Sequence, residues 1–108
     1  MEGSLAELQQ QAEDGDAAAA CKLGDAYREG EGASQDLNLA FRWYQCAAEL
    51  GDADAQNNLG SMLLNGLACE RDSVQASDWY RKSAEQGNTE AQYNLAKRYL
   101  HGDGVNQD

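Results

Sequence analysis

With 108 residues the chain has room for one domain, and a repeat domain of this size buries less of its surface than a compact globule. It has no proline and only one phenylalanine, a composition that favours helices over sheets. Nineteen acidic against eight basic residues give a net charge of -11, which repels phosphate backbones and anionic lipid headgroups and argues against nucleic-acid and membrane-surface partners.

The negative charge lies mainly in the first half of the chain. Residues 1–54 contain 12 acidic and 3 basic residues, whereas residues 55–108 contain 7 acidic and 5 basic residues. A partner with a basic segment would therefore be attracted first to the N-terminal half.

The N-terminus and the cysteines bear on the compartment. The chain does not open with a basic region followed by an apolar run, and no apolar stretch is long enough to span a bilayer. Cys21, Cys46 and Cys69 are an odd number without a C-x-x-C pair, which favours neither a disulfide framework nor a zinc site. We expect a soluble, cytoplasmic protein, although an export signal that had been removed would leave no trace.

The sequence repeats with a period of 36 residues. Residues 16–51 and 52–87 are identical at 13 of 36 positions, and the same register continues to residue 108. The recurring residues include Gly15, Gly51 and Gly87, then Leu23, Leu59 and Leu95, then Gly30, Gly66 and Gly102, and finally Asp36, Asp72 and Asp108. A single repeat domain over residues 1–108 is thus predicted, with an N-terminal half-unit (4–15), repeat 1 (16–51), repeat 2 (52–87) and a C-terminal half-unit (88–108).

The first predicted element is a helix over residues 4–14, where Leu5, Leu8 and Ala12 have the register of the second helix of a unit. Each full unit then begins with a helix that has apolar residues at intervals of four, around Leu23 in repeat 1. Gly24 beside this stripe would let a neighbouring helix come close.

A glycine loop, residues 30–32 in repeat 1, ends the first helix, because glycine supplies the positive φ required there. Asp36 then stands where an N-cap is needed, and the second helix follows with Tyr44 on its apolar stripe. Gly51 and Asp52 combine a helix stop and the next cap in two residues, so consecutive helices must turn back tightly. The Trp-Tyr pairs at 43–44 and 79–80 recur with the period, which indicates packing between helices rather than a stacking platform for a ligand.

The C-terminal half-unit supplies only a first helix, so Leu95 and Tyr99 lack the second helix that would cover them. Either the sequence is a fragment of a longer solenoid, or another molecule, for instance a second copy, covers this end.

These marks, A-x-x-x-L-G-x-x-Y-x-x-G-x-G followed by D-x-x-x-A-x-x-W-Y and A-A-x-x-G, resemble the Sel-one-like repeat family, a relative of the tetratricopeptide repeats. The resemblance implies an all-α fold, a right-handed α/α superhelix or solenoid of about three helix pairs. Leu63 departs from the pattern in place of tyrosine, Ala96 in place of glycine and Ala68 in place of the second loop glycine. Some family members carry paired cysteines that staple each helix pair, but the cysteines here do not follow the period.

In a curved solenoid the first helices line the concave side. Positions two residues past the apolar stripe lie roughly 200° around each helix, on the face that tetratricopeptide-like proteins commonly use to hold peptides. This predicted groove is acidic at one end, amide-lined in the middle, and aromatic and basic at the other. Its residues are Cys21, Asp25, Arg28, Asn57, Ser61, Leu64, Asn65, Tyr93, Lys97, Leu100 and His101. An ordinary solvated face is the open alternative.

The sequence offers no chemistry for catalysis or for a cofactor or metal. His101 is the only histidine, and its place beside Gly102 suits an interaction with the end of a helix. The chain has no G-x-S-x-G and no phosphate-binding glycine loop, and the loop acids are not spaced as a calcium site. Some family members are described as acting on β-lactams, but no Ser-x-x-Lys occurs here. We expect no enzyme.

The function expected is therefore that of a protein-protein interaction module or adaptor that binds a protein or peptide on its concave helical face. The alternative is a self-assembling structural solenoid that uses its uncovered C-terminal end.

Overall fold

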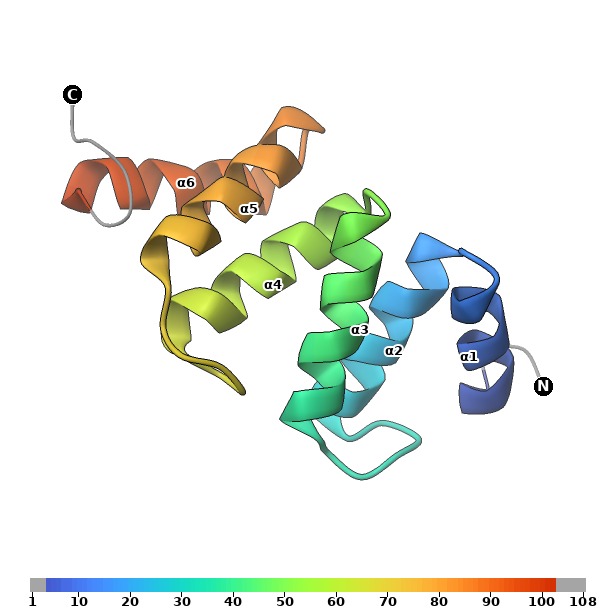
Figure 1. Ribbon diagram of the computed structural model, residues 1–108. Coiled ribbons are helices and arrows are strands. Elements are labelled where there is room, and N and C mark those ends of the chain that lie inside the picture. Colours follow the sequence, from blue (N-terminus) through green and yellow to red (C-terminus); the bar gives the residue numbers. More distant parts are fainter. Residues whose placement is uncertain (1–3, 103–108) are drawn as a thin grey trace.

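The computed structural model describes residues 4–102, which form six α-helices and no strand (Figure 1). In chain order the helices are α1 (Leu5–Glu13), α2 (Ala17–Glu29), α3 (Leu37–Glu49), α4 (Ala53–Asn65), α5 (Ser73–Glu85) and α6 (Thr89–His101). We call α2, α4 and α6 the A helices, and α1, α3 and α5 the B helices, because they alternate as the first and second helices of the units.

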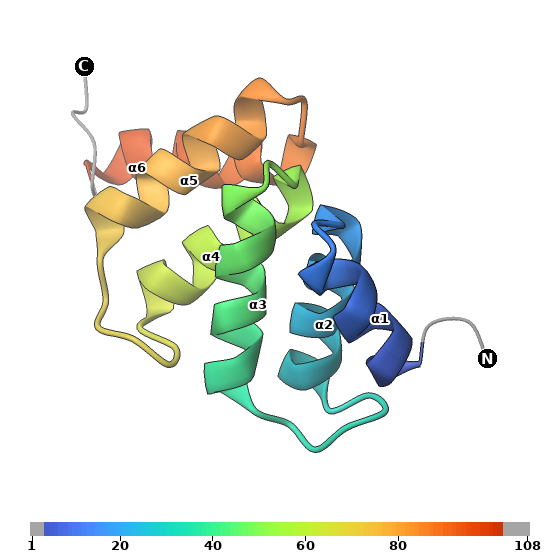
Figure 2. The ribbon, with the colours of Figure 1, turned by 45° about the vertical axis from the view of Figure 1, so that its right-hand side comes forward.

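Each helix packs against the one before it and the one after it, and α2 also contacts α4. The result is an elongated stack with extents of 49 × 25 × 17 Å, in which the A helices follow one another along one side (Figure 2). The predicted fold is confirmed as an all-α, right-handed α/α superhelix of the tetratricopeptide-like kind.

The predicted N-caps are present. The Asp36 and Asp72 carboxylates accept hydrogen bonds from the amides of Leu39 and Gln75, at 3.1 and 2.9 Å. Each A helix also begins at a side-chain cap, in turn Asp16, Asp52 and Asn88. Because the caps satisfy amides that a helix leaves free in its first turn, they fix where each helix starts.

The glycines that end the helices have the backbone conformation that their place demands. Gly30 and Gly66 close α2 and α4 with φ of 74° and 66°, and Gly32 in the following loop has φ of 76°. Ala68 occupies the place of Gly32 in the α4–α5 loop and still adopts φ of 60°. The departure from the glycine pattern therefore leaves the loop conformation unchanged and places an alanine in the left-handed region.

The core of each full unit is a tyrosine ring held in a glycine notch. Tyr44 and Tyr80 are fully buried, and a Cβ added to Gly24 would lie 2.5 Å from Cδ1 of Tyr44. The same addition at Gly60 would lie 2.9 Å from Cε1 of Tyr80. The predicted close approach of the helices at Gly24 is thus confirmed, and only glycine leaves room for it.

The junction between α3, α4 and α5 is partly polar. Gln56 is buried, its Nε2 donates to the carbonyl oxygen of Ala48 at 3.1 Å, and its Oε1 accepts from Gln86 at 2.9 Å. The Ser83 hydroxyl donates to the carbonyl oxygen of Ala53 at 2.6 Å. Because these buried groups are hydrogen-bonded, they fix the relative orientation of the helices without leaving unsatisfied polar atoms.

Apolar residues of the last helix, α6, are exposed, as expected for a first helix without the second helix of its own unit. Among the described residues, Leu95 is half-buried, whereas Tyr99 is 39% and Leu100 is 70% exposed. By comparison, Leu23 and Leu59 at the position of Leu95 are buried.

Candidate functional site

The concave side contains a groove of about 430 Å³ where the three A helices approach one another. We call it the acidic groove. It is lined by Cys21, Asp25, Arg28 and Glu29 of α2, by Glu31 of the loop, by Asp54, Asn57 and Asn58 of α4, and by Glu90 of α6. Five carboxylates and one guanidinium thus face the same space, so the groove carries a strong negative potential.

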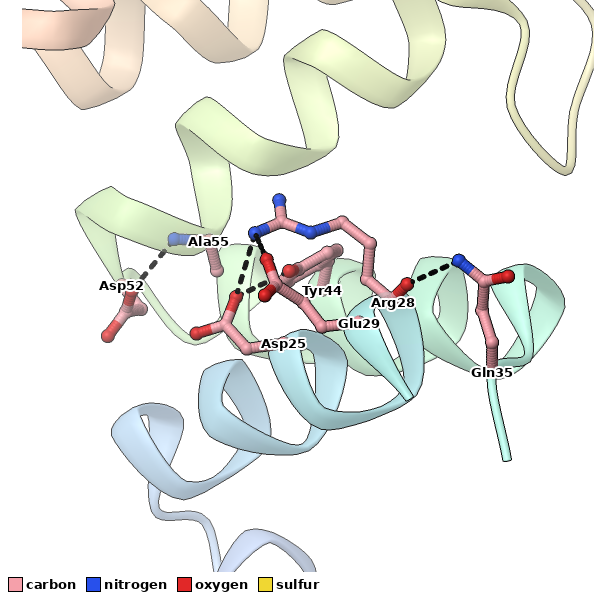
Figure 3. Close-up of polar contacts among 7 residues, drawn as sticks. All are labelled: Asp25, Arg28, Glu29, Gln35, Tyr44, Asp52 and Ala55. Atoms are coloured by element: carbon pink, nitrogen blue, oxygen red, sulfur yellow. Dashed lines mark hydrogen bonds and ion pairs between the residues drawn. The ribbon is translucent and has the colours of Figure 1, made fainter. Parts of the chain in front are cut away.

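Arg28 is the one cation in the lining, and its own neighbours hold it. Its Nη2 lies 3.1 Å from Oε1 of Glu29 and 3.7 Å from Oδ1 of Asp25, and its guanidinium lies 5.6 Å from the centre of the Tyr44 ring. Tyr44 donates a hydrogen bond from its hydroxyl to Asp25 (Figure 3). The cluster ties the wall of the groove to the buried tyrosine of the same unit.

Cys21 and Asn57 form the floor of the groove. They are only 7% and 3% exposed, whereas the helical wheel places them on an outward face. The wheel fixes the direction of a side chain on its own helix, but here the close approach of α2 and α4 covers that direction. Asn57 accepts a hydrogen bond from Nδ2 of Asn94 at 3.0 Å, which links α4 to α6.

The thiol of Cys21 in the floor and the hydroxyl of Tyr44 behind the wall both have low nucleophilic reactivity. Burial, with the nearby carboxylates of Asp52, Asp25 and Asp54, raises the pKa of Cys21 far above that of a free thiol. Burial and the hydrogen bond to Asp25 likewise raise the pKa of Tyr44. Neither group supplies a nucleophile at neutral pH, because both stay protonated.

Of the residues predicted for the middle of the groove, Asn57 lies in this cavity, whereas Ser61, Leu64 and Asn65 lie outside it and partly make contacts within the fold. The Ser61 hydroxyl lies 2.9 Å from the Tyr80 hydroxyl, the pair that corresponds to Asp25 and Tyr44. Asn65 donates to the carbonyl oxygen of Ser61 at 2.8 Å, one helical turn back. Leu64 is half-buried against the core.

The predicted aromatic and basic end lies on α6. Tyr93 is 65% exposed, and Nζ of Lys97 lies 5.2 Å from the centre of its ring. Leu100 and His101 are also exposed, in the last turn before the left-handed cap Gly102. Of the eleven predicted groove residues, the structure brings Cys21, Asp25, Arg28 and Asn57 together in the acidic groove.

Five lining residues are not among the eleven predicted ones, namely Glu29, Glu31, Asp54, Asn58 and Glu90. Asp54 and Glu90 are 36 residues apart and stand three residues before Asn57 and Tyr93. Residues three apart share a helix face, so this signal was available in the repeat register.

Within residues 4–102, no group of three or more His, Cys, Asp or Glu side chains has an arrangement that could hold a metal ion. None of the helices in this range is both long and apolar enough to cross a membrane.

Comparisons with solved structures give close matches. A Sel1 repeat protein from Oxalobacter formigenes is 34% identical, with a TM-score of 0.84, over 88% of this chain and 39% of that one. A protective antigen of uropathogenic Escherichia coli with an SLR fold is 40% identical, with a TM-score of 0.91, over 96% of this chain and 22% of that one. Cysteine rich protein B of Helicobacter pylori is 26% identical, with a TM-score of 0.80, over 84% of this chain and 68% of that one.

The chain therefore spans less than half the length of the first two structures. No curated protein sequence matches the chain. The sequence model of the Sel1 repeat matches residues 17–52, 53–88 and 89–108, which together cover most of the chain. The protein belongs to the Sel1 repeat family.

Proposed function

We propose that this chain is a protein-protein interaction module that holds a segment of another protein on the concave side of its superhelix. The Sel1 repeat fold generally serves as a scaffold for such interactions. The observation that carries the proposal is the acidic groove, because successive units jointly build a recess that a single helix pair could not form.

The eleven predicted groove residues remain the proposed contact surface, with the acidic groove at one end and Tyr93, Leu64 and Lys97 further along the A helices. The exposed Tyr93 and the half-buried Leu64 are the proposed anchors, since a few such residues carry most of the energy of an interface. The partner in this proposal has a basic segment, and neither nucleic acid nor a membrane is its target.

The module has no catalytic role in this proposal. Burial raises the pKa of the groove thiol Cys21, which disfavours its reactive thiolate form, and the single histidine is exposed at the end of α6. The cytoplasmic location likewise remains part of the proposal, since it rests on the unpaired cysteines of the sequence.

The proposal is tested by a low-salt pull-down from a source lysate with the wild type and the Tyr93→Ala, Leu64→Ala double variant. A matched control, Leu50→Ala with Val74→Ala, removes two exposed apolar side chains from around the B helices. We expect a partner that the wild type and the control retain and the double variant loses. Equal retention by all three proteins would place the binding site elsewhere.

The second candidate function, self-assembly, is favoured by the exposed apolar residues of α6. Tyr99 and Leu100 are 39% and 70% exposed, and α1 carries two acids whereas the last turn of α6 carries Arg98 and His101. A second copy that stacked end to end would bring these opposite charges together. Sedimentation that shows only monomers at micromolar concentration would exclude this as the main role.

A further inference from the structure

We infer that the acidic groove is a subsite for an arginine side chain on an extended partner segment, and that Arg28 occupies part of this subsite in the free protein. The inference rests on the proposed function and deepens it by naming the chemistry that the groove selects. In this inference Arg28 lowers the affinity for the partner segment, whereas a residue in a binding groove would usually be expected to raise it.

The charge of the lining is only partly compensated within the fold. Arg28 neutralises part of the charge of Asp25 and Glu29, through contacts of 3.7 and 3.1 Å. The other three carboxylates come from three different elements, Glu31 from the loop, Asp54 from α4 and Glu90 from α6. Asp54 accepts one hydrogen bond, from Nδ2 of Asn88 at 2.9 Å, and no lysine or arginine of residues 4–102 forms an ion pair with any of the three.

The floor supplies a second, independent feature that points to a ligand. Asn57 lines the groove and is only 3% exposed, and its Oδ1 accepts a hydrogen bond from Asn94. Its Nδ2 donates to no atom of residues 4–102 and is not closed off from the groove, so a free donor remains at the bottom of the recess. A peptide carbonyl oxygen is a suitable acceptor for this donor, because it would replace the water that meets Nδ2 in the free protein.

The cavity also has the right size and surface for a guanidinium. About 430 Å³ holds one long side chain with its backbone, and carboxylates on several sides match the five donors of arginine. Arg28 itself shows how the walls treat such a group, because it is paired with two carboxylates and lies over the face of Tyr44 (Figure 3). An incoming arginine would compete with it for the same partners.

The probe for the test is a capped nonapeptide with three arginines separated by serines. Its controls are the same peptide with citrulline, which keeps the shape and removes the charge, and one with glutamate. Fluorescence anisotropy at low salt measures binding to the whole chain. We expect the arginine peptide to bind at least tenfold more tightly than the citrulline peptide, and the glutamate peptide not to bind.

Two variants of equal charge separate the groove from the general field. The groove variant is Glu31→Gln with Glu90→Gln, and the control is Glu49→Gln with Glu85→Gln, which removes exposed acids at the ends of α3 and α5. We expect the groove variant to bind the arginine peptide roughly tenfold more weakly and the control to change it less than about twofold. An equal loss in both would reduce the effect to net charge and overturn the inference.

The Arg28→Gln variant separates a competing role of Arg28 from a direct role in binding, because the two roles predict opposite changes in the affinity for the arginine peptide. Removing the resident guanidinium frees Asp25 and Glu29, so binding should tighten by about threefold or more. Weaker binding in a variant with an unchanged melting temperature would show that Arg28 strengthens the binding of the ligand, and would overturn its role as a competitor. If a pull-down partner depends on Tyr93 and Leu64 but not on Glu31 and Glu90, the proposed function stands and the arginine subsite fails. If the peptide binds in the predicted order without any such partner, the subsite stands alone.

Discussion

At the scale of single residues, the pairing of a buried tyrosine with a notch glycine is the most restrictive contact in the fold. A Cβ at Gly24 would lie 2.5 and 2.6 Å from two carbons of the Tyr44 ring. Because the ring is fully buried and its hydroxyl is bonded to Asp25, it cannot move aside cheaply. Gly24→Ala should therefore lower the free energy of unfolding by about 3 kcal/mol, measured by urea titration.

Ala96 occupies the same register position in α6 and provides the control. No tyrosine ring of residues 4–102 lies in its notch, since the chain places no B helix after α6 in this range. Ala96→Gly should lower the free energy of unfolding by only about 1 kcal/mol, the usual effect of glycine inside a helix. Equal losses at the two sites would mean that the notch contact contributes nothing specific.

Much of this residue-scale pattern can be predicted from the sequence, because caps and glycines act locally. Asp36 and Asp72 could be identified as N-caps from their spacing alone, and the structure agrees. The floor of the acidic groove could not be predicted in the same way. The burial of Cys21 and Asn57 depends on how closely neighbouring A helices approach, and that distance is set by packing between units rather than by the register of one helix.

At the scale of elements, the loops within the units have the same shape with different residues. Gly32 and Ala68 hold equivalent places with φ of 76° and 60°. An L-residue in the left-handed region costs on the order of 1 kcal/mol, whereas glycine adopts it freely. Ala68→Gly should therefore raise the free energy of unfolding by about 1 kcal/mol, and Gly32→Ala should lower it by a similar amount, both measured by urea titration.

The opposite signs at two equivalent sites make this pair a sharp test of the loop geometry. A loss of stability in Ala68→Gly would show that the added freedom of the unfolded chain outweighs the relief of strain. The junction that follows has a different basis, because the buried amide of Gln56 joins α4 to α3 and to the C-cap of α5. Ala20 stands at the position of Gln56 in the first repeat, so the two junctions are specified by different chemistry.

At the scale of the whole molecule, the repeat period and the helix order are properties of the sequence, whereas the recess on the concave side is a property of the stack. Its lining comes from three A helices and a loop, so it exists only when neighbouring units are packed. Any binding that uses the acidic groove should therefore be lost together with the packing of the units, and not helix by helix.

The net charge of -11 leads to a prediction about stability as a whole. The ion pairs Arg28–Asp25, Arg28–Glu29 and Arg81–Asp78 are all partly exposed, so screening them costs little. Repulsion among the many carboxylates is long-ranged, and the Debye length falls to about 8 Å at physiological salt. Raising sodium chloride from low to physiological concentration should thus raise the melting temperature by about 5 °C.

The Glu31→Gln, Glu90→Gln variant tests whether the repulsion comes mainly from the carboxylates of the acidic groove. If the carboxylates of the acidic groove are a main source, the variant should melt at a higher temperature than the wild type at low salt and should gain less from added salt. The Glu49→Gln, Glu85→Gln variant has the same net charge, and its gain from salt should stay nearer to that of the wild type. A melting temperature that falls with salt would show that the exposed ion pairs outweigh the repulsion, and that the groove is not a strained cluster of like charges.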